Sequence, residues 1–259
     1  LPDVVDVLIH APGEMAEVSP RIRRVLCGNA GPFTFKGTST FIVGHGQVAV
    51  IDPGPDDPSH FQALLHALRG ETVTHVVVTH SHADHSPLAA RLKAATGAST
   101  YAFGAVAGGP DTGLRLDAGI DHGFVPDETL ADGGILTGPD WTLEAVHTPG
   151  HMSNHMCFSL REEGALFAGD HVMAWATSVI APPDGNMGEY YASLRKLLTR
   201  GDAVYYPAHG PERRDPLPLV RGYLAHRRMR ETAILQRVRS GAGSIGSIVA
   251  AIYADVDPR

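Results

Sequence analysis

Short apolar segments rich in β-branched residues recur along the first 207 residues, and most of them end at a turn-forming residue. Segments of this kind predict β-strands. Segment 73–79 is apolar or β-branched at nearly every position, which is typical of a buried strand. The predicted strands are 4–9, 22–27, 39–43, 48–51, 73–79, 141–147, 156–161, 166–168 and 203–206.

Helical signals separate several of these strands. Ser59 is the predicted N-cap of a helix over 61–68, and Pro87 begins a second helix. A third helix is predicted over 189–198. Strands that alternate with helices indicate a mixed α/β fold. Residues 104–140 are rich in glycine, proline and aspartate and predict loops with little regular structure.

The pattern becomes purely helical after Pro216. An arginine-rich helix is predicted over 219–238, and apolar residues spaced at i, i+3, i+4 and i+7 from Ile245 predict a shorter amphipathic helix. We therefore expect two parts: a larger domain over 1–213, and an arginine-rich helical segment over 214–259 that ends incomplete.

Composition excludes several classes of protein. The chain has 259 residues, 43% of them hydrophobic and 19% charged, as expected for a globular protein. No apolar run reaches the roughly 18–20 residues of a membrane helix, and the start lacks the basic region of a secretory signal. The two cysteines have no metal-type spacing, so we expect free thiols, a cytoplasmic location and no membrane contact.

Charge is distributed unevenly along the chain. The formal net charge of −7 disfavours a general nucleic-acid coat. Residues 213–240 nevertheless hold eight arginines against two acidic residues, a local charge of +6 on an acidic body. An arginine-laced helix is commonly a solvated face. The alternative is an anion-binding surface, for which Arg227, Arg228 and Arg230 are the candidates.

The densest group of reactive side chains directly follows the predicted strand 73–79. It is the run His80-Ser81-His82-Ala83-Asp84-His85. Alternate residues of an extended segment point to the same side, so His80 and His82 can share one ion, whereas Asp84 and His85 aim at a neighbouring position. A single histidine is most often a surface or core residue, but this run predicts a metal site.

Three further candidate ligands, His151, Asp170 and His209, lie at the ends of later predicted strands. With the histidine run they provide five imidazoles and two carboxylates. Such donors suit zinc, iron or manganese better than calcium. They are too many for one four- or five-coordinate ion, but they suffice for two ions that share a bridging carboxylate and leave room for water.

Four motifs carry a resemblance to a known family: Thr79-His80-Ser81-His82-Ala83-Asp84-His85, Thr148-Pro149-Gly150-His151, Gly169-Asp170 and Pro207-Ala208-His209-Gly210. With them the chain resembles the metallo-β-lactamase-fold hydrolases. Segments 29–34, 37–40, 179–185 and 226–227 are similar to the lactamase-β-like-2 branch, which has a small winged-helix-like C-terminal domain and includes single-strand-RNA endonucleases. The resemblance implies a four-layer αββα sandwich, a dinuclear site at the rim of its two sheets, and a winged-helix-like tail.

The resemblance also implies a role for each ligand. His80, His82 and His151 would hold the first ion, Asp84, His85 and His209 the second, and Asp170 would bridge them. Two zinc ions are the implied cofactors, with iron or manganese as alternatives. A hydroxide held between two cations attacks an ester, thioester or phosphodiester centre. Asp84 would have a second, catalytic role in orienting this nucleophile.

Neighbours of the ligands are further candidates. His155 and His171 each lie within four residues of a ligand, so we expect them either to donate a proton to the leaving group or contact a substrate anion, or to support the ligands from behind. Asp52, which closes the predicted strand 48–51, is expected to be either the hydrogen-bond partner of a metal-bound histidine or a turn residue. Trp175 is expected to pack rather than bind.

These observations predict a dinuclear metal-dependent hydrolase of a phosphodiester or ester-type bond, with single-stranded RNA or a small ester as substrate. One alternative is a thioester or lactone hydrolase similar to glyoxalase II, because such enzymes share all seven ligands. True β-lactamases of this fold lack the bridging aspartate, and the diiron oxygen-reducing relatives carry glutamate in place of His82, so both chemistries are disfavoured.

A second alternative is a nucleic-acid-binding module with a structural metal. It is disfavoured because structural zinc sites are closed and commonly rich in cysteine. The arginine-rich face has one more alternative use, as the interface of a homo-oligomer.

Overall fold

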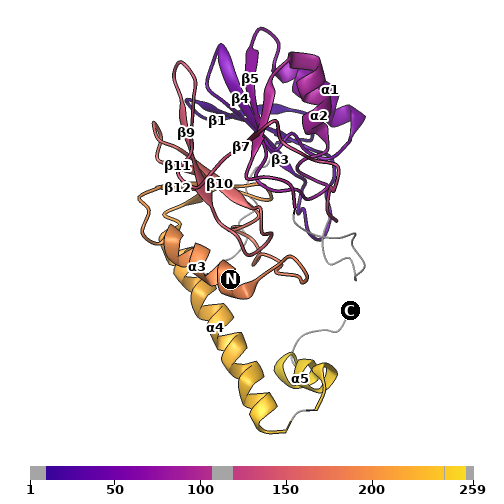
Figure 1. The fold of residues 1–259 in the computed structure, drawn as a ribbon, viewed down its shortest axis with the longest axis vertical. Helices are drawn as coiled ribbons and strands as arrows, with labels where there is room; N and C mark the ends of the chain where they lie inside the picture. The colour runs from indigo at the N-terminus through magenta and orange to yellow at the C-terminus, as the bar shows by residue number, and fades with distance from the viewer. Residues whose placement is uncertain (1–9, 107–118, 242, 255–259) are drawn as a thin grey trace. The chain divides into compact units, whose positions relative to one another are not determined.

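The computed structural model describes residues 10–106, 119–241 and 243–254 (Figure 1). The chain divides into two compact units, one that ends at Pro216 and one that begins at Leu217. The strand predicted over 4–9 lies outside the described residues.

The first unit contains two β-sheets whose strand order follows the chain closely. The first sheet has the order β1 to β7: Met15–Ser19, Ile22–Leu26, Ser39–Val43, Gln47–Ile51, Thr72–Val77, Ser99–Ala102 and Glu128–Thr129. The second has the order β13-β12-β11-β10-β9-β8, in which β8 is Ile135–Thr137, β9 Thr142–His147, β10 Met156–Leu160, β11 Ala165–Gly169, β12 Val204–Pro207 and β13 Arg213–Arg214.

Alternation along the strands divides the core into two layers. In β3, Phe41 faces the apolar layer between the sheets, where Phe158 and Phe167 of the second sheet also lie. Its neighbour Ile42 faces the opposite side and packs in a second layer with Leu64, because successive side chains of a strand point to opposite faces. Because both of their faces are buried, strands β4, β10 and β11 are apolar at almost every position.

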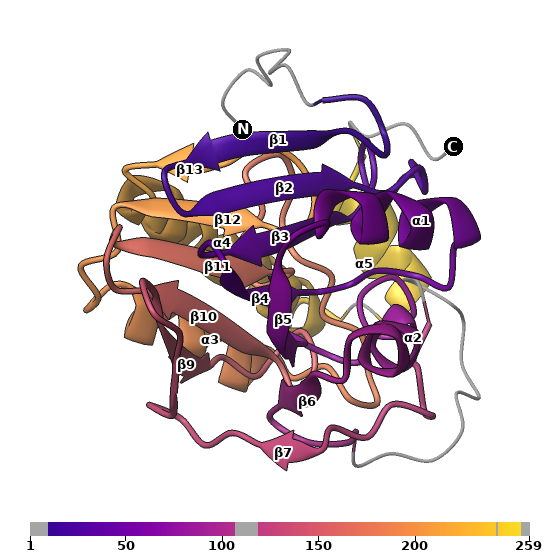
Figure 2. The ribbon, with the colours of Figure 1, turned by 90° about the horizontal axis from the view of Figure 1, so that it is seen from above.

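Helices cover the outer faces of the two sheets. Helices α1 (Pro58–Ala67) and α2 (Leu88–Thr96) supply apolar side chains to the second core layer. Helix α3 (Met187–Leu197) buries Tyr190, Leu194 and Leu197. In Figure 2, α1 and α2 lie beside the first sheet and α3 beside the second. The four-layer αββα sandwich implied by the resemblance is therefore confirmed.

Several predicted details are wrong. The N-cap of α1 is Asp57 and not Ser59: its carboxylate accepts hydrogen bonds from the backbone N–H groups of Ser59 and His60 at 2.7 and 2.9 Å. Proline occupies the first turn of this helix, where its missing N–H costs nothing. Strands β1 and β6 were not predicted, and β7 and β8 lie in a region predicted as loops.

Both helices predicted for the second unit are confirmed, as α4 (Leu217–Arg239) and α5 (Ile245–Ile252). The Arg230 guanidinium lies 4.5 Å from the centre of the Tyr253 ring, which ties the two helices together. Within residues 217–241 and 243–254 all regular structure is helical, so the winged-helix character of this tail stays a prediction.

The remaining global expectations concern membranes and thiols. No helix among the described residues is both long and apolar enough to cross a bilayer. Cys27 and Cys157 are buried free thiols, as predicted.

A buried histidine in α1 gives the first testable prediction. His60 is 3% exposed, and its Nε2 lies 2.9 Å from the Thr40 hydroxyl. Burial lowers the pKa of His60 from 6.5 to about 4. The unfolded chain therefore takes up a proton below pH 6.5 that the folded chain refuses, so stability falls as the pH drops toward 4.

We expect His60→Gln to remove this part of the acid sensitivity. Between pH 7 and 4.5, the free energy of unfolding of the parent should fall by about 2–3 kcal/mol more than that of the variant. Urea unfolding at both pH values measures the difference. Parallel pH profiles of the two proteins would contradict it.

Candidate metal centre

The topology brings the predicted ligands to one edge of both sheets. Strands β11 and β12 are parallel, so the residues after them, Asp170 and His209, meet at the same edge. Strand β10 is antiparallel to β11, which puts the turn before β10, with His151, at that edge as well. The run from His80 to His85 follows β5 of the facing sheet.

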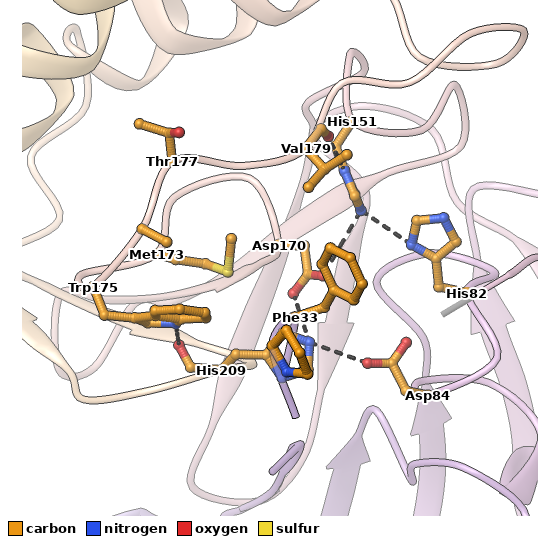
Figure 3. Close-up of a pocket in the computed structure, with 12 residues that line it drawn as sticks. Phe33, His82, Asp84, His151, Asp170, Met173, Trp175, Thr177, Val179 and His209 are labelled. Atoms are coloured by element: carbon orange, nitrogen blue, oxygen red, sulfur yellow. Dashed lines mark hydrogen bonds and ion pairs between the residues drawn. The ribbon is translucent and has the colours of Figure 1, made fainter. Parts of the chain in front are cut away.

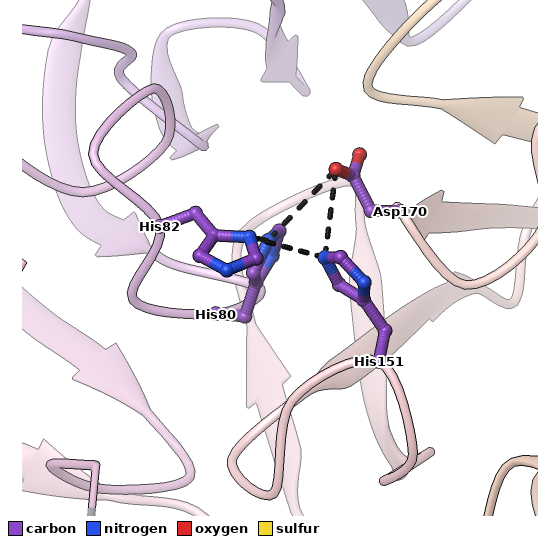
Figure 4. A group of neighbouring side chains, drawn as sticks. All are labelled: His80, His82, His151 and Asp170. Carbon is purple, nitrogen blue, oxygen red and sulfur yellow. Dashed lines mark hydrogen bonds and ion pairs between the residues drawn. The ribbon is translucent and has the colours of Figure 1, made fainter. Parts of the chain in front are cut away.

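The structure gathers the seven side chains into two adjoining groups that could each hold a metal ion. The first consists of His80, His82, His151 and Asp170, all buried (Figure 4). His82 Nδ1 lies 3.0 Å from His80 Nε2 and 3.1 Å from His151 Nε2. The second consists of Asp84, His85 and His209, also buried, with His209 Nε2 3.1 Å from Asp84 Oδ2.

One carboxylate faces both groups. Asp170 Oδ2 lies 4.0 Å from His80 Nε2 and 3.7 Å from His151 Nε2 in the first group. It also lies 3.6 Å from His85 Nε2, while Oδ1 is 3.3 Å from His209 Nε2. This is the position of the bridging carboxylate that the resemblance implies.

Hydrogen bonds behind the groups set which nitrogen of each imidazole carries the proton. The Thr79 hydroxyl donates to Asp52 Oδ2 at 2.7 Å, so at 3.0 Å it accepts from His80 Nδ1. His85 Nδ1 lies 2.9 Å from the same Asp52 oxygen. His151 Nδ1 lies 2.5 Å from the Val179 carbonyl oxygen. Each Nδ1–H is thereby used, and the Nε2 lone pair faces the cluster.

Asp52 itself adopts an uncommon backbone conformation. It has φ = +50° immediately after β4, and its carboxylate accepts both the backbone N–H and the hydroxyl of Thr79. Three hydrogen bonds therefore hold this carboxylate between the histidine run and the end of the neighbouring strand. The position matches the supporting role that its place in the sequence predicts.

The electrostatics of the cluster are dominated by burial and by contact between opposite charges. Burial opposes a charged imidazole, but the Asp84, Asp170 and Asp52 carboxylates hold the pKa of His85 well above its usual value. Asp170 and Asp84 likewise raise the pKa of His209 to about 9. Although burial opposes it, neighbouring His85 and His209 lower the pKa of Asp84 to about 2.

The donor set fits metal ions on an independent observation. Asp84 Oδ1, His85 Nε2 and Asp170 Oδ1 are buried and have no hydrogen-bond partner. A buried polar atom without a partner is costly. All three point into the same cluster, where cations would satisfy them together. The chemistry of the set, imidazoles and carboxylates without thiolates, suits zinc, iron or manganese.

The two extra histidines lie behind the cluster. His155 Nε2 accepts the backbone N–H of Asp170 at 3.2 Å, and its Nδ1 lies 2.9 Å from the Thr148 hydroxyl. His171 is fully buried, its two ring nitrogens lack partners, and burial lowers its pKa to about 3. Neither histidine lines the cavity described next.

A small cavity of about 220 Å³ lies over the cluster (Figure 3). Five predicted ligands line it: His82, Asp84, His151, Asp170 and His209. Its remaining walls are mostly apolar and consist of Pro32, Phe33, Met173, Trp175, Ala176, Thr177 and Val179.

Trp175 borders the cavity in addition to the packing expected for it. Its ring stacks on Phe35 at 5.0 Å, and its indole N–H donates to the His209 carbonyl at 3.2 Å. Thr79 was not predicted to support a ligand, although it directly precedes the histidine run and a hydroxyl at this position can accept a hydrogen bond from an imidazole. Phe33 carries no comparable signal, because it lies in a loop without periodicity.

The arginines proposed for anion binding lie on α4, in the second unit. Arg228 is exposed, whereas Arg227 and Arg230 are half-buried. Arg230 contacts Tyr253 and points one guanidinium nitrogen at the Ile252 carbonyl, 3.5 Å away. This side chain therefore packs α4 against α5.

Comparison with known proteins identifies the class of protein. The model of the metallo-beta-lactamase superfamily matches residues 33–209, and the chain belongs to that superfamily of metal-dependent hydrolases.

The names of similar proteins describe narrower activities than the superfamily does. The chain is 34% identical over 258 residues to the atrochrysone carboxyl ACP thioesterase AgnL7 of Paecilomyces divaricatus, covering 94% of this chain and 73% of the relative. It is 34% identical over 238 residues to an atrochrysone carboxyl ACP thioesterase of Aspergillus terreus, covering 88% and 67%. Among solved structures, a beta-lactamase domain protein from Burkholderia ambifaria has a TM-score of 0.76 at 20% identity, covering 96% of this chain and 86% of that chain.

The glycine before Asp170 gives a prediction about the cluster. Gly169 has φ = +50°, and a Cβ there would lie 2.5 Å from His155 Nε2 and 3.0 Å from the Thr79 hydroxyl. Gly169→Ala must therefore displace the residues that position Asp170. We expect a loss of about 1–3 kcal/mol in stability from backbone strain, together with about tenfold weaker zinc binding.

Thermal unfolding and competition with a chromogenic chelator measure the two effects. Gly201→Ala is the matched control, because its Cβ would meet nothing within 4 Å and its backbone is not left-handed. If both glycine variants bind zinc like the parent, the tight position assigned to Gly169 is wrong.

Proposed function

We propose that this chain is a dinuclear zinc thioesterase. Its substrate is a thioester whose acyl group is compact and apolar. Two observations support the proposal: the thioesterase names of relatives 34% identical to the chain, and the apolar cavity over the donor cluster. The thioester alternative therefore moves ahead of the phosphodiester and oxygen-ester substrates that the sequence analysis favoured.

The ligand roles follow the two groups of donors. His80, His82 and His151 would hold one ion, Asp84, His85 and His209 the other, and Asp170 would contact both. Two divalent ions at these positions would lower the pKa of a bound water to about 7 and polarise the thioester carbonyl. The protein's own contribution is to fix the donors from behind through Asp52, Thr79 and the Val179 carbonyl.

The few proton donors that border the cavity also favour a thioester. Apart from the donor cluster, its described polar side chains are Thr177 and Trp175, and the Trp175 N–H already donates to a carbonyl. Hydrolysis forms a bond from a water oxygen to the carbonyl carbon and breaks the C–S bond. A thiolate of pKa about 8.5 leaves without protonation, whereas an alkoxide needs an acid. We therefore assign His155 and His171 no proton transfer, and His155 a role in holding Asp170.

The cavity walls disfavour a polyanionic substrate. None of the described residues that line the cavity is lysine or arginine, the side chains that usually contact phosphates. Phe33, Met173 and Val179 instead offer apolar surface to an acyl group and keep water away from the carbonyl (Figure 3). A volume of about 220 Å³ admits the acyl group, while the carrier of the thiol stays outside.

A substrate panel tests the reaction class. The zinc-loaded protein is assayed with a benzoyl thioester of N-acetylcysteamine, the matching oxygen ester, a lactone, a p-nitrophenyl phosphodiester and single-stranded RNA. We expect kcat/KM for the thioester to exceed that for the oxygen ester by about 100-fold or more, because the described residues that line the cavity offer no acid outside the donor cluster to protonate an alkoxide. Faster cleavage of the phosphodiester or of RNA would overturn the thioesterase assignment.

Variants separate the ligand from other histidines. His82→Ala should lose most of its bound zinc and its activity, because His82 lines the cavity and faces both His80 and His151. His66→Ala is the matched control, since His66 is exposed on α1. Zinc content by elemental analysis and thioesterase rates give the comparison. Retention of zinc and turnover by His82→Ala would refute the ligand role.

A further inference from the structure

The segment that forms much of the cavity wall is fastened to the loop that carries His151. This wall segment, residues 173–185, connects β11 to α3 and provides Met173, Trp175 and Val179 to the cavity. At its far end Asp184 accepts two hydrogen bonds from a single residue of the neighbouring loop. Ser153 N–H donates to Oδ2 and the Ser153 hydroxyl to Oδ1, both at 2.7 Å.

The local backbone holds Asp184 in place for this contact. The Gly185 N–H donates to the Ala181 carbonyl at 2.8 Å, which closes a tight turn around the aspartate. A Cβ at Gly185 would lie 2.5 Å from the Ala181 nitrogen, so the turn has room only for glycine. Pairing both carboxylate oxygens with one residue fixes the direction of the contact as well as its distance.

The same two segments meet a second time, at the donor cluster. Ser153 lies two residues after His151, and the His151 Nδ1 reaches the Val179 carbonyl of the wall segment at 2.5 Å. That bond fixes the imidazole with its Nε2 toward His82. The Asp184 contact and the Val179 contact therefore form the two ends of one clasp between the wall segment and the His151 loop.

We propose that Asp184 is a positioning residue that, through Ser153, holds the cavity wall and the His151 imidazole in register. The proposal rests on the function proposed above, to which it adds a residue outside the cavity. When both contacts are made, the Val179 carbonyl stays opposite His151, and Trp175 and Met173 stay against the acyl group. Without them, the wall segment keeps its covalent ends but loses its fixed distance from the ligand loop.

Three variants separate the contact from the charge. Asp184→Ala removes both hydrogen bonds. Asp184→Asn keeps the shape and can keep both, with Ser153 N–H donating to the amide oxygen and the amide NH₂ donating to the Ser153 hydroxyl. Ser153→Ala removes only the hydroxyl bond and leaves the backbone one. Asp56→Ala is the matched control, because Asp56 is an exposed aspartate that pairs with Arg91.

Hydrogen exchange of the wall segment and zinc affinity are the decisive measurements. For Asp184→Ala we expect exchange in peptides from residues 173–185 to be about tenfold faster or more, and zinc binding to be about tenfold weaker. Ser153→Ala should fall between this variant and the parent. Asp184→Asn and Asp56→Ala should stay within about twofold of the parent.

The activity assay adds a split between the kinetic constants. Loss of the fixed wall should raise KM for the thioester with a smaller effect on kcat, because the wall contacts the acyl group and not the scissile bond. Equal exchange rates and zinc affinities in the parent and Asp184→Ala would overturn the proposal. So would an Asp184→Asn variant as impaired as Asp184→Ala, which would point to the charge.

These measurements remain decisive if the thioesterase assignment fails. Exchange and zinc affinity require no substrate, so a parent protein inactive on thioesters still reveals whether the clasp exists. Should Asp184→Ala fail to fold, Ser153→Ala, which deletes one hydroxyl, gives the same two measurements. A Ser153→Ala protein that is unchanged in both would then count against the clasp.

Discussion

The structure depends on a carboxylate that two groups of imidazoles share. Asp170 lies within 4.0 Å of ring nitrogens from both groups, in a place where water is largely excluded. Lone pairs of His80, His82 and His151 converge beside it, although like partial charges at such distances repel. A bound cation would offset this repulsion, because it attracts all of these donor atoms at once. The carboxylates that face His85 and His209 raise the pKa of both imidazoles, so the cluster favours positive charge.

Hydrogen bonds from the surrounding fold hold several of the donors in place. His80, His85 and His151 are each restrained by a hydrogen bond on Nδ1, and the three partners come from different elements. Asp52 follows β4, Thr79 follows β5, and Val179 lies on the wall segment. A substitution in any of these elements can thus change metal binding without touching a ligand. Because His155 and Thr79 both pack against the backbone at Gly169, there is no room for a side chain at that position.

Much of this arrangement could be predicted from the sequence because its signals are local. The histidine run occupies six consecutive residues. Asp52, Asp170 and His209 each follow an apolar strand, which indicates that all three lie at the ends of strands, near the same edge of the sheets. Among the described residues, eight predicted strands and all five predicted helices begin or end within one residue of their observed bounds for the same reason. The strand β1 escaped notice because only Ala16 in it is buried, which leaves almost no apolar pattern.

Other features could not be predicted because they join residues distant in the sequence. His151 and His155 differ little in local sequence, and only the contacts of His155 with Thr148 and the Asp170 N–H reveal that it faces away from the cavity. The cavity wall combines Phe33 with residues about 140 positions later. Asp184 and Ser153 are 31 residues apart. Loops of this kind have no periodicity from which a contact could be inferred.

Crystals grown with zinc and measured at the zinc absorption edge test the central claim most directly. If Asp170 is shared by two ions, the anomalous difference map should contain two peaks in the cluster, roughly 3.5–4 Å apart, one on each side of this carboxylate. A single peak at full zinc loading, or two peaks of which neither contacts Asp170, would contradict a dinuclear centre built around a shared carboxylate.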